Sequence, residues 1–264
     1  MILKKGGLRL KNKIKKSNHI YPLVSIITVV RNGEKYLEQT IKSVLNQSYN
    51  NIEYLIIDGD SKDKTLKIIK KYNNKIDYWV SQKDNGLWDA MNKGIKLAKG
   101  SIIGIINSDD TYNKNAVKIA VKYLKNNFDF VFGSVQKYKL LCGFKPWKVK
   151  FSFGFYTSHS VGFFIKTKAQ KKIGFYNTKF LSADLDLFYR MLTNYKLIGT
   201  ASKKTEVFGK FRPGGFSSKV NYLDHLEDLN KIRVHNGQSK FYVYFLFIFK
   251  LIKNFNKARK AIWY

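Results

Sequence analysis

The 264-residue sequence has one cysteine, few acidic residues and no long hydrophobic run. Because Cys142 stands alone, no disulfide can form within the chain, which fits a reducing compartment. The longest uncharged apolar run, residues 241–249, falls short of the roughly 20 apolar residues of a membrane span. No apolar stretch follows the basic N-terminus before Ile20, so no secretory signal is expected. We therefore expect a cytoplasmic location.

The shortage of acidic residues leaves a large positive charge. Lys and Arg total 49 against 18 Asp and Glu, which gives a formal net charge of +31. Such a chain is attracted to polyanions, which include nucleic acid, anionic lipid head groups and phosphorylated substrates. Arginine is scarce, although nucleic-acid-binding proteins favour it for bidentate contacts. The composition favours a general electrostatic surface, and a basic nucleic-acid-binding protein stays an alternative.

Strand-like and helix-like patterns alternate through the first half of the chain. Some apolar runs are typical of buried parallel strands. Between them lie segments whose apolar residues have helical spacing, such as Leu37, Ile41 and Val44. The alternation predicts an α/β fold with a Rossmann-like, mostly parallel sheet and flanking helices. After residue 136 the alternation stops, and a further helix is predicted from Ser182. The predicted strands are residues 23–30, 52–57, 76–80, 102–106 and 128–135.

Polar clusters follow three of the predicted strands, at residues 31–32, 58–60 and 107–110. Ligands of open α/β sheets bind beyond the carboxyl ends of the strands, so these clusters predict a site. Adjacent carboxylates at Asp109 and Asp110 are costly at the tip of a buried strand unless positive charge lies there. A hard divalent cation would supply that charge. The alternative is a turn whose Asp and Asn side chains cap the next helix.

Five segments in a fixed order, together with a sixth near residue 184, resemble the motifs of one enzyme family. They are similar to family 2 glycosyltransferases of the GT-A fold, and especially to bacterial enzymes that build surface polysaccharides such as capsule, O-antigen or colanic acid. Five ordered segments at compatible spacing are specific, where a single one would be weak. The segments are residues 24–32, 43–48, 56–61, 84–94, 107–110 and 182–187.

The resemblance implies a nucleoside-diphosphate-sugar donor, commonly linked to uridine, and a bound Mn²⁺ or Mg²⁺ ion. Asp109 would bind the metal with help from Asp110, although the neutral Asn107 stands where the family usually has a carboxylate. Asp58 would contact the base. The nucleotide-sugar site that the resemblance implies consists of Thr28, Val30, Asn32, Asp58, Asp89, Asn92, Ser108 and Asp109.

The resemblance also implies that Asp184 is the base that takes the proton of the acceptor hydroxyl. Asp186 competes with it, because two residues along a helix differ by about 200° and only one can face the site. A first-turn Asp also suits the helix dipole without any catalytic role. His159, Arg212 and Ser217 are candidates for contacts to the acceptor or diphosphate. Their alternatives are a structural histidine and an ordinary surface turn.

We therefore expect an inverting glycosyltransferase that acts on a hydroxyl of a lipid-linked or saccharide acceptor in surface polysaccharide biosynthesis. A catalytically inactive relative that only binds nucleotide sugars stays an alternative. The aromatic and basic C-terminal tail is expected to be helical. It suits an anionic membrane surface, which would place the protein on the inner face of the cell membrane; packing on the domain or on a second subunit is the other reading. The expected parts are a basic, poorly ordered arm (1–21), a nucleotide-sugar-binding α/β half (22–136), an acceptor-binding half (137–235) and the tail (236–264).

Overall fold

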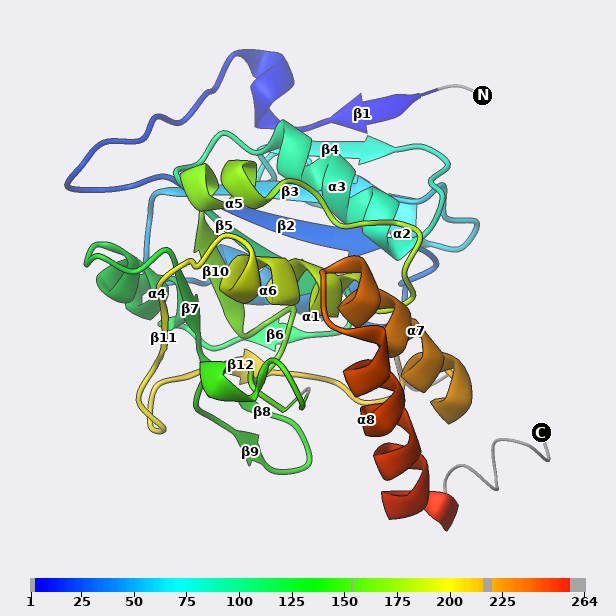
Figure 1. The fold of residues 1–264 in the computed structure, drawn as a ribbon. Coiled ribbons are helices and arrows are strands. Elements are labelled where there is room, and N and C mark those ends of the chain that lie inside the picture. Colours follow the sequence, from blue (N-terminus) through cyan, green and yellow to red (C-terminus); the bar gives the residue numbers. More distant parts are fainter. Residues whose placement is uncertain (1–2, 153, 216–219, 257–264) are drawn as a thin grey trace.

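The computed structural model describes residues 3–152, 154–215 and 220–256. An eight-stranded sheet, in the order β1-β4-β3-β2-β5-β10-β7-β11, forms the centre, and helices cover both of its faces (Figure 1). A second sheet of four strands, in the order β6-β12-β8-β9, lies beside it. This arrangement confirms the predicted α/β class.

Four neighbouring strands of the large sheet run parallel. Every residue of β2 and β3 is buried, because helices cover both faces, and this explains their unbroken apolar runs. Each strand lies within two residues of its predicted bounds. The four are β4 (Tyr78–Ser81), β3 (Ile52–Asp58), β2 (Val24–Val30) and β5 (Ile102–Asn107).

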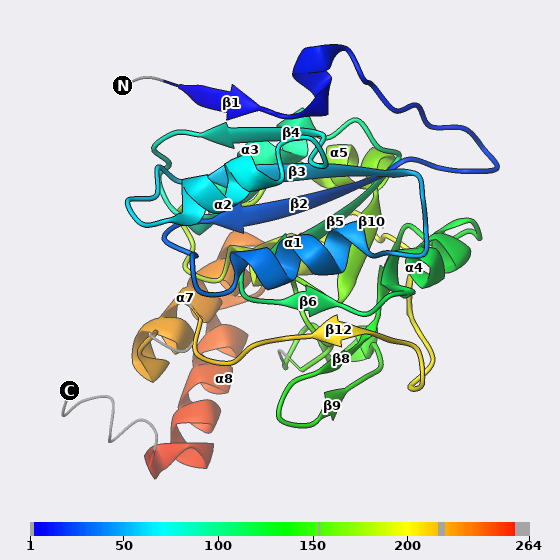
Figure 2. The same ribbon diagram turned by 180° about the vertical axis from the view of Figure 1, so that it is seen from behind.

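Two hydrophobic cores lie on the two faces of this sheet. Side chains at helical spacing on α1, such as Leu37, Ile41 and Val44, pack on the first face, which is turned to the viewer in Figure 2. The second face carries residues such as Met91 and Leu187. The first group of helices is α1 (Leu37–Leu45), α2 (Thr65–Lys71) and α4 (Ala116–Leu124), and the second is α3 (Leu87–Leu97), α5 (Thr167–Ile173) and α6 (Ala183–Thr193).

The fifth predicted strand, residues 128–135, is divided between the two sheets. β7 (Phe130–Phe132) belongs to the large sheet, whereas β8 (Ser134–Gln136) belongs to the small one. Gly133 lies between them, and an added Cβ there would meet the Phe208 ring at 2.0 Å. The prediction of one continuous strand is therefore wrong. The strand is divided at Gly133, where the ring of the distant Phe208 leaves no room for a larger side chain.

The remaining strands come from the second half of the chain and the turn after β5. In the large sheet, β10 runs antiparallel to both β5 and β7, which the alternating pattern did not predict. The strands are β10 (Phe163–Lys166) and β11 (Gly199–Ala201) in the large sheet, and β6 (Thr111–Tyr112), β9 (Leu140–Leu141) and β12 (Val207–Lys210) in the small one. A short 3₁₀ helix, η2 (Pro146–Lys148), lies between β9 and β10 in the chain.

In its described part, the N-terminal arm contains a strand and a short helix, whereas the sequence predicted a poorly ordered arm. β1 (Lys4–Gly6) pairs antiparallel with β4 at the edge of the large sheet, and η1 (Leu8–Lys11) follows it. Arg9 forms an ion pair with the buried Glu53 and donates a hydrogen bond of 2.9 Å to the carbonyl of Leu97. The arm is basic, but part of its charge is neutralised by a buried acid of β3.

The chain ends in two packed helices, α7 (Tyr222–His235) and α8 (Lys240–Lys253), which confirms the predicted helical tail. α7 also contacts α6. α8 projects away from the large sheet beyond the rest of the body (Figure 1). Within residues 3–152, 154–215 and 220–256, none of the helices has the length and hydropathy to cross a membrane.

The contact between Gly133 and Phe208 yields a stability prediction. Gly133→Ala places a methyl group inside the Phe208 ring, so the variant should lose about 1–3 kcal/mol of unfolding free energy. Gly154→Ala is the matched control, because its nearest atom lies 3.8 Å away. Denaturant titration of both variants measures the difference. Equal stability of the two variants would contradict the steric account.

Candidate active site

The acidic turn Asn107-Ser108-Asp109-Asp110 follows β5 directly. The backbone N–H of Asp110 donates to the carbonyl of Asn107 at 3.2 Å and closes the turn. The Thr40 hydroxyl of α1 lies 2.9 Å from the carbonyl oxygen of Ser108 and 2.7 Å from that of Asp110. The turn is therefore fixed against α1 as well as against its own strand.

The two carboxylates of the turn have different surroundings. Asp110 is buried; it accepts hydrogen bonds from the backbone N–H of Arg212 at 2.9 Å and from the Ser160 hydroxyl at 2.7 Å. Burial raises its pKa to about 7. Its two oxygens join the turn to two distant segments of the chain. The help that Asp110 was expected to give to a metal ion stays a prediction.

Asp109 is half-buried, and burial raises the pKa of its carboxyl while Arg212 opposes that shift. The Oδ1 atom of Asn107 is buried and has no hydrogen-bond partner among the described residues. Among the described residues, no three His, Cys, Asp or Glu side chains are grouped so as to hold a metal ion. The turn thus offers one carboxylate and one amide oxygen. That set fits Mg²⁺ or Mn²⁺, which bind through one or two carboxylates together with phosphate oxygens and water.

Arg212 crosses the acidic turn. Its Nε donates to the carbonyl of Asp109 at 3.0 Å, and one terminal nitrogen donates to Gln39 at 3.0 Å. The guanidinium also lies 3.8 Å from the centre of the Tyr36 ring. Gly215 follows Arg212 by three residues. A Cβ added to Gly215 would lie 3.2 Å from Asp109 Oδ2, so this segment lies against the acidic turn. Ser217, the other candidate in the segment, lies outside the described residues.

Two residues expected to line the nucleotide pocket are in the hydrophobic core. Thr28 is fully buried, and its hydroxyl lies 3.1 Å from that of Tyr54. Val30 packs among the side chains that face α1, and its carbonyl accepts a hydrogen bond from Gly59 at 2.9 Å. Their side chains point into the core, because alternate side chains of a strand covered on both faces point into one core or the other. Their expected place in the nucleotide pocket stays a prediction.

Asp58 and Asn92 are also turned inward. Asp58 is completely buried; its carboxylate accepts hydrogen bonds from the hydroxyls of Ser61 and Ser81, so it shapes the turn after β3. Asn92 exchanges two hydrogen bonds of 2.9 Å with the backbone of Tyr176. Both side chains fix the backbone around the site, and their expected contacts to base, ribose or diphosphate stay predictions.

Other polar groups at the strand ends are accessible. Asn32 is exposed with a φ of 52°, and its side chain accepts a hydrogen bond of 2.8 Å from the backbone of Lys62. Asp60 is partly exposed with a φ of 59°. Asp84, which the sequence did not single out, lies against the turn: an added Cβ on Gly59 would meet its carboxylate at 2.4 Å. Asp60 and Asp84 are thus accessible acids close to Asp58, the residue expected to contact the base.

Asp89, in the first turn of α3, is half-buried. Its carboxylate accepts a hydrogen bond of 3.0 Å from the backbone of Asn85 and pairs with Lys93 at 3.0 Å. Burial raises its pKa, but these two partners outweigh that effect and the net shift is downward. Asp89 is therefore ionised at neutral pH. Its predicted role with ribose or diphosphate stays a prediction.

The structure separates the two acids of α6. Asp186 is completely buried, pairs with Arg190 at 2.9 Å and accepts a hydrogen bond from Asn236. Asp184 is half-buried and accepts a hydrogen bond of 3.3 Å from the Tyr156 hydroxyl. Only Asp184 is accessible to an acceptor, so the geometry favours it over Asp186 as a base.

Aromatic residues surround Asp184. Trp88 stacks on Tyr176 with ring centres 5.4 Å apart, and its edge contact with His159 spans 5.5 Å. Burial raises the pKa of Tyr156 and Tyr176, and it lowers the pKa of His159 although Asp184 opposes that shift. His159 lies 2.9 Å from the Tyr176 hydroxyl, which satisfies one ring nitrogen. The aromatic cluster carries no charge and lies around a single carboxylate. Such a cluster suits contact with the apolar face of a sugar ring.

Asp228 and His225 of α7 complete this region, and neither was predicted. The Asp228 carboxylate accepts hydrogen bonds from the backbone N–H groups of Leu181 at 3.1 Å and Ser182 at 2.7 Å. Ser182 makes no side-chain cap; its hydroxyl lies 3.0 Å from His225 Nδ1. Asp228 therefore caps α6 from another helix and fixes the turn that carries Asp184.

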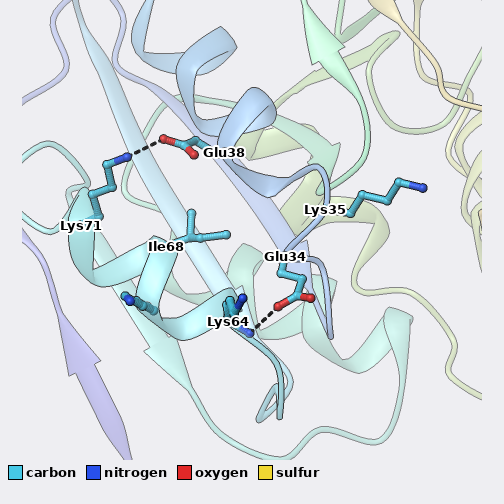
Figure 3. Close-up of a pocket in the computed structure, with 7 residues that line it drawn as sticks. Glu34, Lys35, Glu38, Lys64, Ile68 and Lys71 are labelled. Carbon is cyan, nitrogen blue, oxygen red and sulfur yellow. Dashed lines mark hydrogen bonds and ion pairs between the residues drawn. The ribbon is translucent and has the colours of Figure 1, made fainter.

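A separate pocket lies between α1 and α2 (Figure 3). Its volume is about 690 Å³, and none of the described candidate site residues lines it. An ion pair of 2.8 Å between Lys71 and Glu38 crosses it, and Glu34 accepts a hydrogen bond from the backbone of Lys64. Because Glu38 already pairs with Lys71 and Glu34 adds a second negative charge, we regard this pocket as a weaker anion site than the acidic turn with a bound cation.

Comparison with known proteins identifies the family. The profile described as Glycosyl transferase family 2 matches residues 25–194, well over half of the chain and all of the region from β2 to the end of α6. The chain belongs to glycosyl transferase family 2. The match includes the acidic turn and Asp184, but not α7 and α8.

Several curated proteins share this family 2 region. An uncharacterized glycosyltransferase of Rickettsia typhi is 39% identical over 109 residues, which are 41% of this chain and 34% of that protein. Another, from Methanocaldococcus jannaschii, is 29% identical over 190 residues and 66% of each chain. The Escherichia coli UDP-Glc:alpha-D-GlcNAc-diphosphoundecaprenol beta-1,3-glucosyltransferase WfgD is 34% identical over 116 residues, 43% of this chain and 46% of WfgD. The match thus spans about a third of the Rickettsia relative.

Solved structures with the same fold include a protein in complex with UDP-GlcNAc and a mannosyltransferase. S. aureus TarS 1-349, in complex with UDP-GlcNAc, has a TM-score of 0.64 at 18% identity over 85% of this chain and 70% of that chain. Mannosyltransferase PcManGT from Pyrobaculum calidifontis, in complex with GDP-Man and Mn²⁺, has a TM-score of 0.61 at 16% identity over 86% and 68%. At this identity the likeness concerns the fold, and it confirms the predicted GT-A architecture.

The cap on α6 yields a local prediction. Asp228→Ala leaves the backbone N–H groups of Leu181 and Ser182 without their carboxylate partner, at a cost of about 0.5–2 kcal/mol. Hydrogen exchange of amides 181–184 should become faster in this variant. Glu227→Ala, which removes an exposed acid of the same helix, should leave that exchange unchanged. If the two variants show the same exchange, Asp228 does not hold the start of α6.

Proposed function

We propose that this family 2 protein is an inverting glycosyltransferase that moves a sugar from a UDP-linked donor to a hydroxyl group of a lipid-linked or saccharide acceptor. Surface polysaccharide synthesis is the process that we propose for it. Family membership supports sugar transfer, and the name of WfgD, which combines a UDP-linked donor with a diphosphoundecaprenol acceptor, supports both substrate classes. The complex of TarS with UDP-GlcNAc supports the uridine nucleotide.

The observation that carries this proposal is the acidic turn at the carboxyl end of β5. Asp109 lies there partly exposed beside the orphan oxygen of Asn107, and Arg212 crosses the same turn. A carboxylate, an unsatisfied acceptor and a guanidinium in one place suit a diphosphate together with its cation. A helix cap alone, the other reading of the turn, leaves the buried Asn107 oxygen unexplained.

The nucleotide would lie across the ends of the parallel strands. Asn32, Asp60 and Asp84 are the accessible polar groups at the ends of β2, β3 and β4, and we assign the base and ribose to them. Ser108, half-buried in the acidic turn, and Asp89 at the start of α3 lie at the same edge as further candidates for the diphosphate sugar. The buried Asp58 holds the loop that presents Asp60.

Transfer with inversion requires a base on the acceptor side. We propose that Asp184 accepts the proton of the acceptor hydroxyl as its oxygen attacks the anomeric carbon and the nucleoside diphosphate leaves. Tyr156 holds the carboxylate by a hydrogen bond, and Trp88 with Tyr176 offers aromatic faces to a sugar. A Mn²⁺ or Mg²⁺ ion at Asp109 would supply Lewis-acid stabilisation to the leaving diphosphate. Arg212 would add a fixed positive charge.

A nucleotide-sugar-binding protein without transferase activity is the alternative, and the same donor site would serve it. The two differ at Asp184, which a binding protein does not need. The accessible position of Asp184 beside the aromatic cluster favours catalysis. The net positive charge alone would also suit a nucleic-acid-binding protein, but the family match explains the acidic strand ends that such a protein would lack.

Donor and metal binding can be tested by thermal shift. UDP-sugars with Mn²⁺ should raise the melting temperature, and saturation at 100 times the dissociation constant corresponds to about 2.7 kcal/mol. Asp109→Ala should lose the metal-dependent part of this gain, whereas the exposed Asp224→Ala should keep it. If no nucleotide sugar stabilises the protein, or if Asp109→Ala responds to metal as the wild type does, the donor site is wrong.

The catalytic base is tested by separating binding from transfer. Asp184→Asn should bind the donor with unchanged affinity while the transfer rate falls about 10²–10⁴-fold, because the amide cannot accept the proton. Calorimetry measures the first quantity, and release of UDP in the presence of acceptor measures the second. Glu227→Gln serves as the matched exposed control. Transfer by Asp184→Asn at the wild-type rate excludes Asp184 as the base.

A further inference from the structure

The helix α8 presents a continuous apolar face to solvent. The exposed fractions reach 85% for Phe241, 62% for Phe245 and 72% for Ile252. These residues recur at the spacing of one helix face, which we call the apolar stripe of α8. The stripe consists of Phe241, Tyr244, Phe245, Ile248 and Ile252, with Phe249 at its margin and the exposed Phe255 just beyond the helix.

The opposite face of α8 is already in use. Val243 and Leu246 are buried against the body, and α8 packs along α7. The Tyr222 hydroxyl of α7 donates to the carbonyl of Lys250 at 3.3 Å. The helix is therefore held in position with the stripe turned outward, and Figure 1 shows it projecting from the molecule. Soluble monomers rarely expose a contiguous aromatic patch of this kind without a partner for it.

The charge of the protein decides which partner fits. A second copy would bring two bodies of +31 together along this face, and like-charge repulsion opposes that contact. An anionic bilayer complements both the charge and the stripe, because aromatic side chains bury themselves at the acyl boundary while lysines remain among the head groups. The exposed Lys240 and Lys253 lie at the two ends of α8. At 14 residues the helix is shorter than the roughly 20 needed to span a membrane.

We propose that the apolar stripe of α8 docks on an anionic lipid bilayer, with the helix lying in the plane of the interface. Helix α7 connects the apolar stripe of α8 to the candidate active site. α7 packs on α8, and it also supplies Asp228 and His225 to the start of α6, where Asp184 lies. Docking therefore places the acceptor side of the protein next to the bilayer. Resting on the proposed function, this favours a membrane-resident acceptor over a soluble saccharide.

Vesicle binding tests the docking of the full chain without any assay of transfer. Wild-type protein should sediment with phosphatidylglycerol-containing vesicles and much less with pure phosphatidylcholine vesicles. The double substitution Phe245→Ser and Ile252→Ser removes two apolar side chains of the stripe but no charge, and it should weaken binding at least about tenfold. The control Ile20→Ser with Ile198→Ser removes two exposed apolar side chains elsewhere and should bind like the wild type. Unchanged melting temperatures confirm that each variant is folded.

Two outcomes would overturn the proposal. Wild-type affinity of the Phe245→Ser, Ile252→Ser variant for anionic vesicles would show that the stripe does not contact lipid. A wild-type dimer in light scattering that this substitution dissociates, with vesicle binding unaffected, would assign the stripe to a second copy of the chain. Donor binding measured on the same variant separates these outcomes from a failure of the proposed function, because the stripe is not part of the donor site.

Discussion

The buried carboxylate of Asp110 joins three segments that are far apart in the sequence. It belongs to the turn after β5, and it accepts hydrogen bonds from Ser160 and from the backbone of Arg212. A buried carboxylate without such partners is strongly destabilising, so the three segments must be held together in the folded state. This constraint places Asp109 and Arg212 side by side at the strand ends. The donor half and the segment after β12 therefore form one site through the carboxylate of Asp110.

Other acids have similar internal roles. Asp58 fixes the turn after β3, Asp186 pairs with Arg190, and Asp228 caps α6. Each is buried, although the chain has only 18 acidic residues against 49 basic ones. Acids that are buried contribute little negative charge to the surface. The excess of basic over acidic groups on the surface is therefore larger than the composition alone indicates, and Asp109 and Asp184 are among the acids that remain partly exposed.

The sequence predicts the parallel centre of the fold well, because burial on both faces imposes unbroken apolar runs on β2, β3 and β5. It does not predict the division at Gly133, which depends on the ring of Phe208, more than seventy residues away. The motifs likewise locate the site but not the direction of each side chain. Asp58 and Asp110 belong to the turns that the motifs predict, but their side chains point inward. Asp228 leaves no signal, because its cap on Ser182 exists only once α7 packs on α6.

The N-terminal strand has a consequence for the behaviour of the protein in concentrated solution. β1 covers one edge of the large sheet and β11 the other, and both are only three residues long. A short edge offers few free N–H and C=O groups to an incoming strand, and Lys4 and Lys5 place positive charge along one of them. Without β1, the all-parallel and highly apolar β4-β3-β2 region would end in an open edge. The arm thereby protects the molecule against edge-to-edge aggregation.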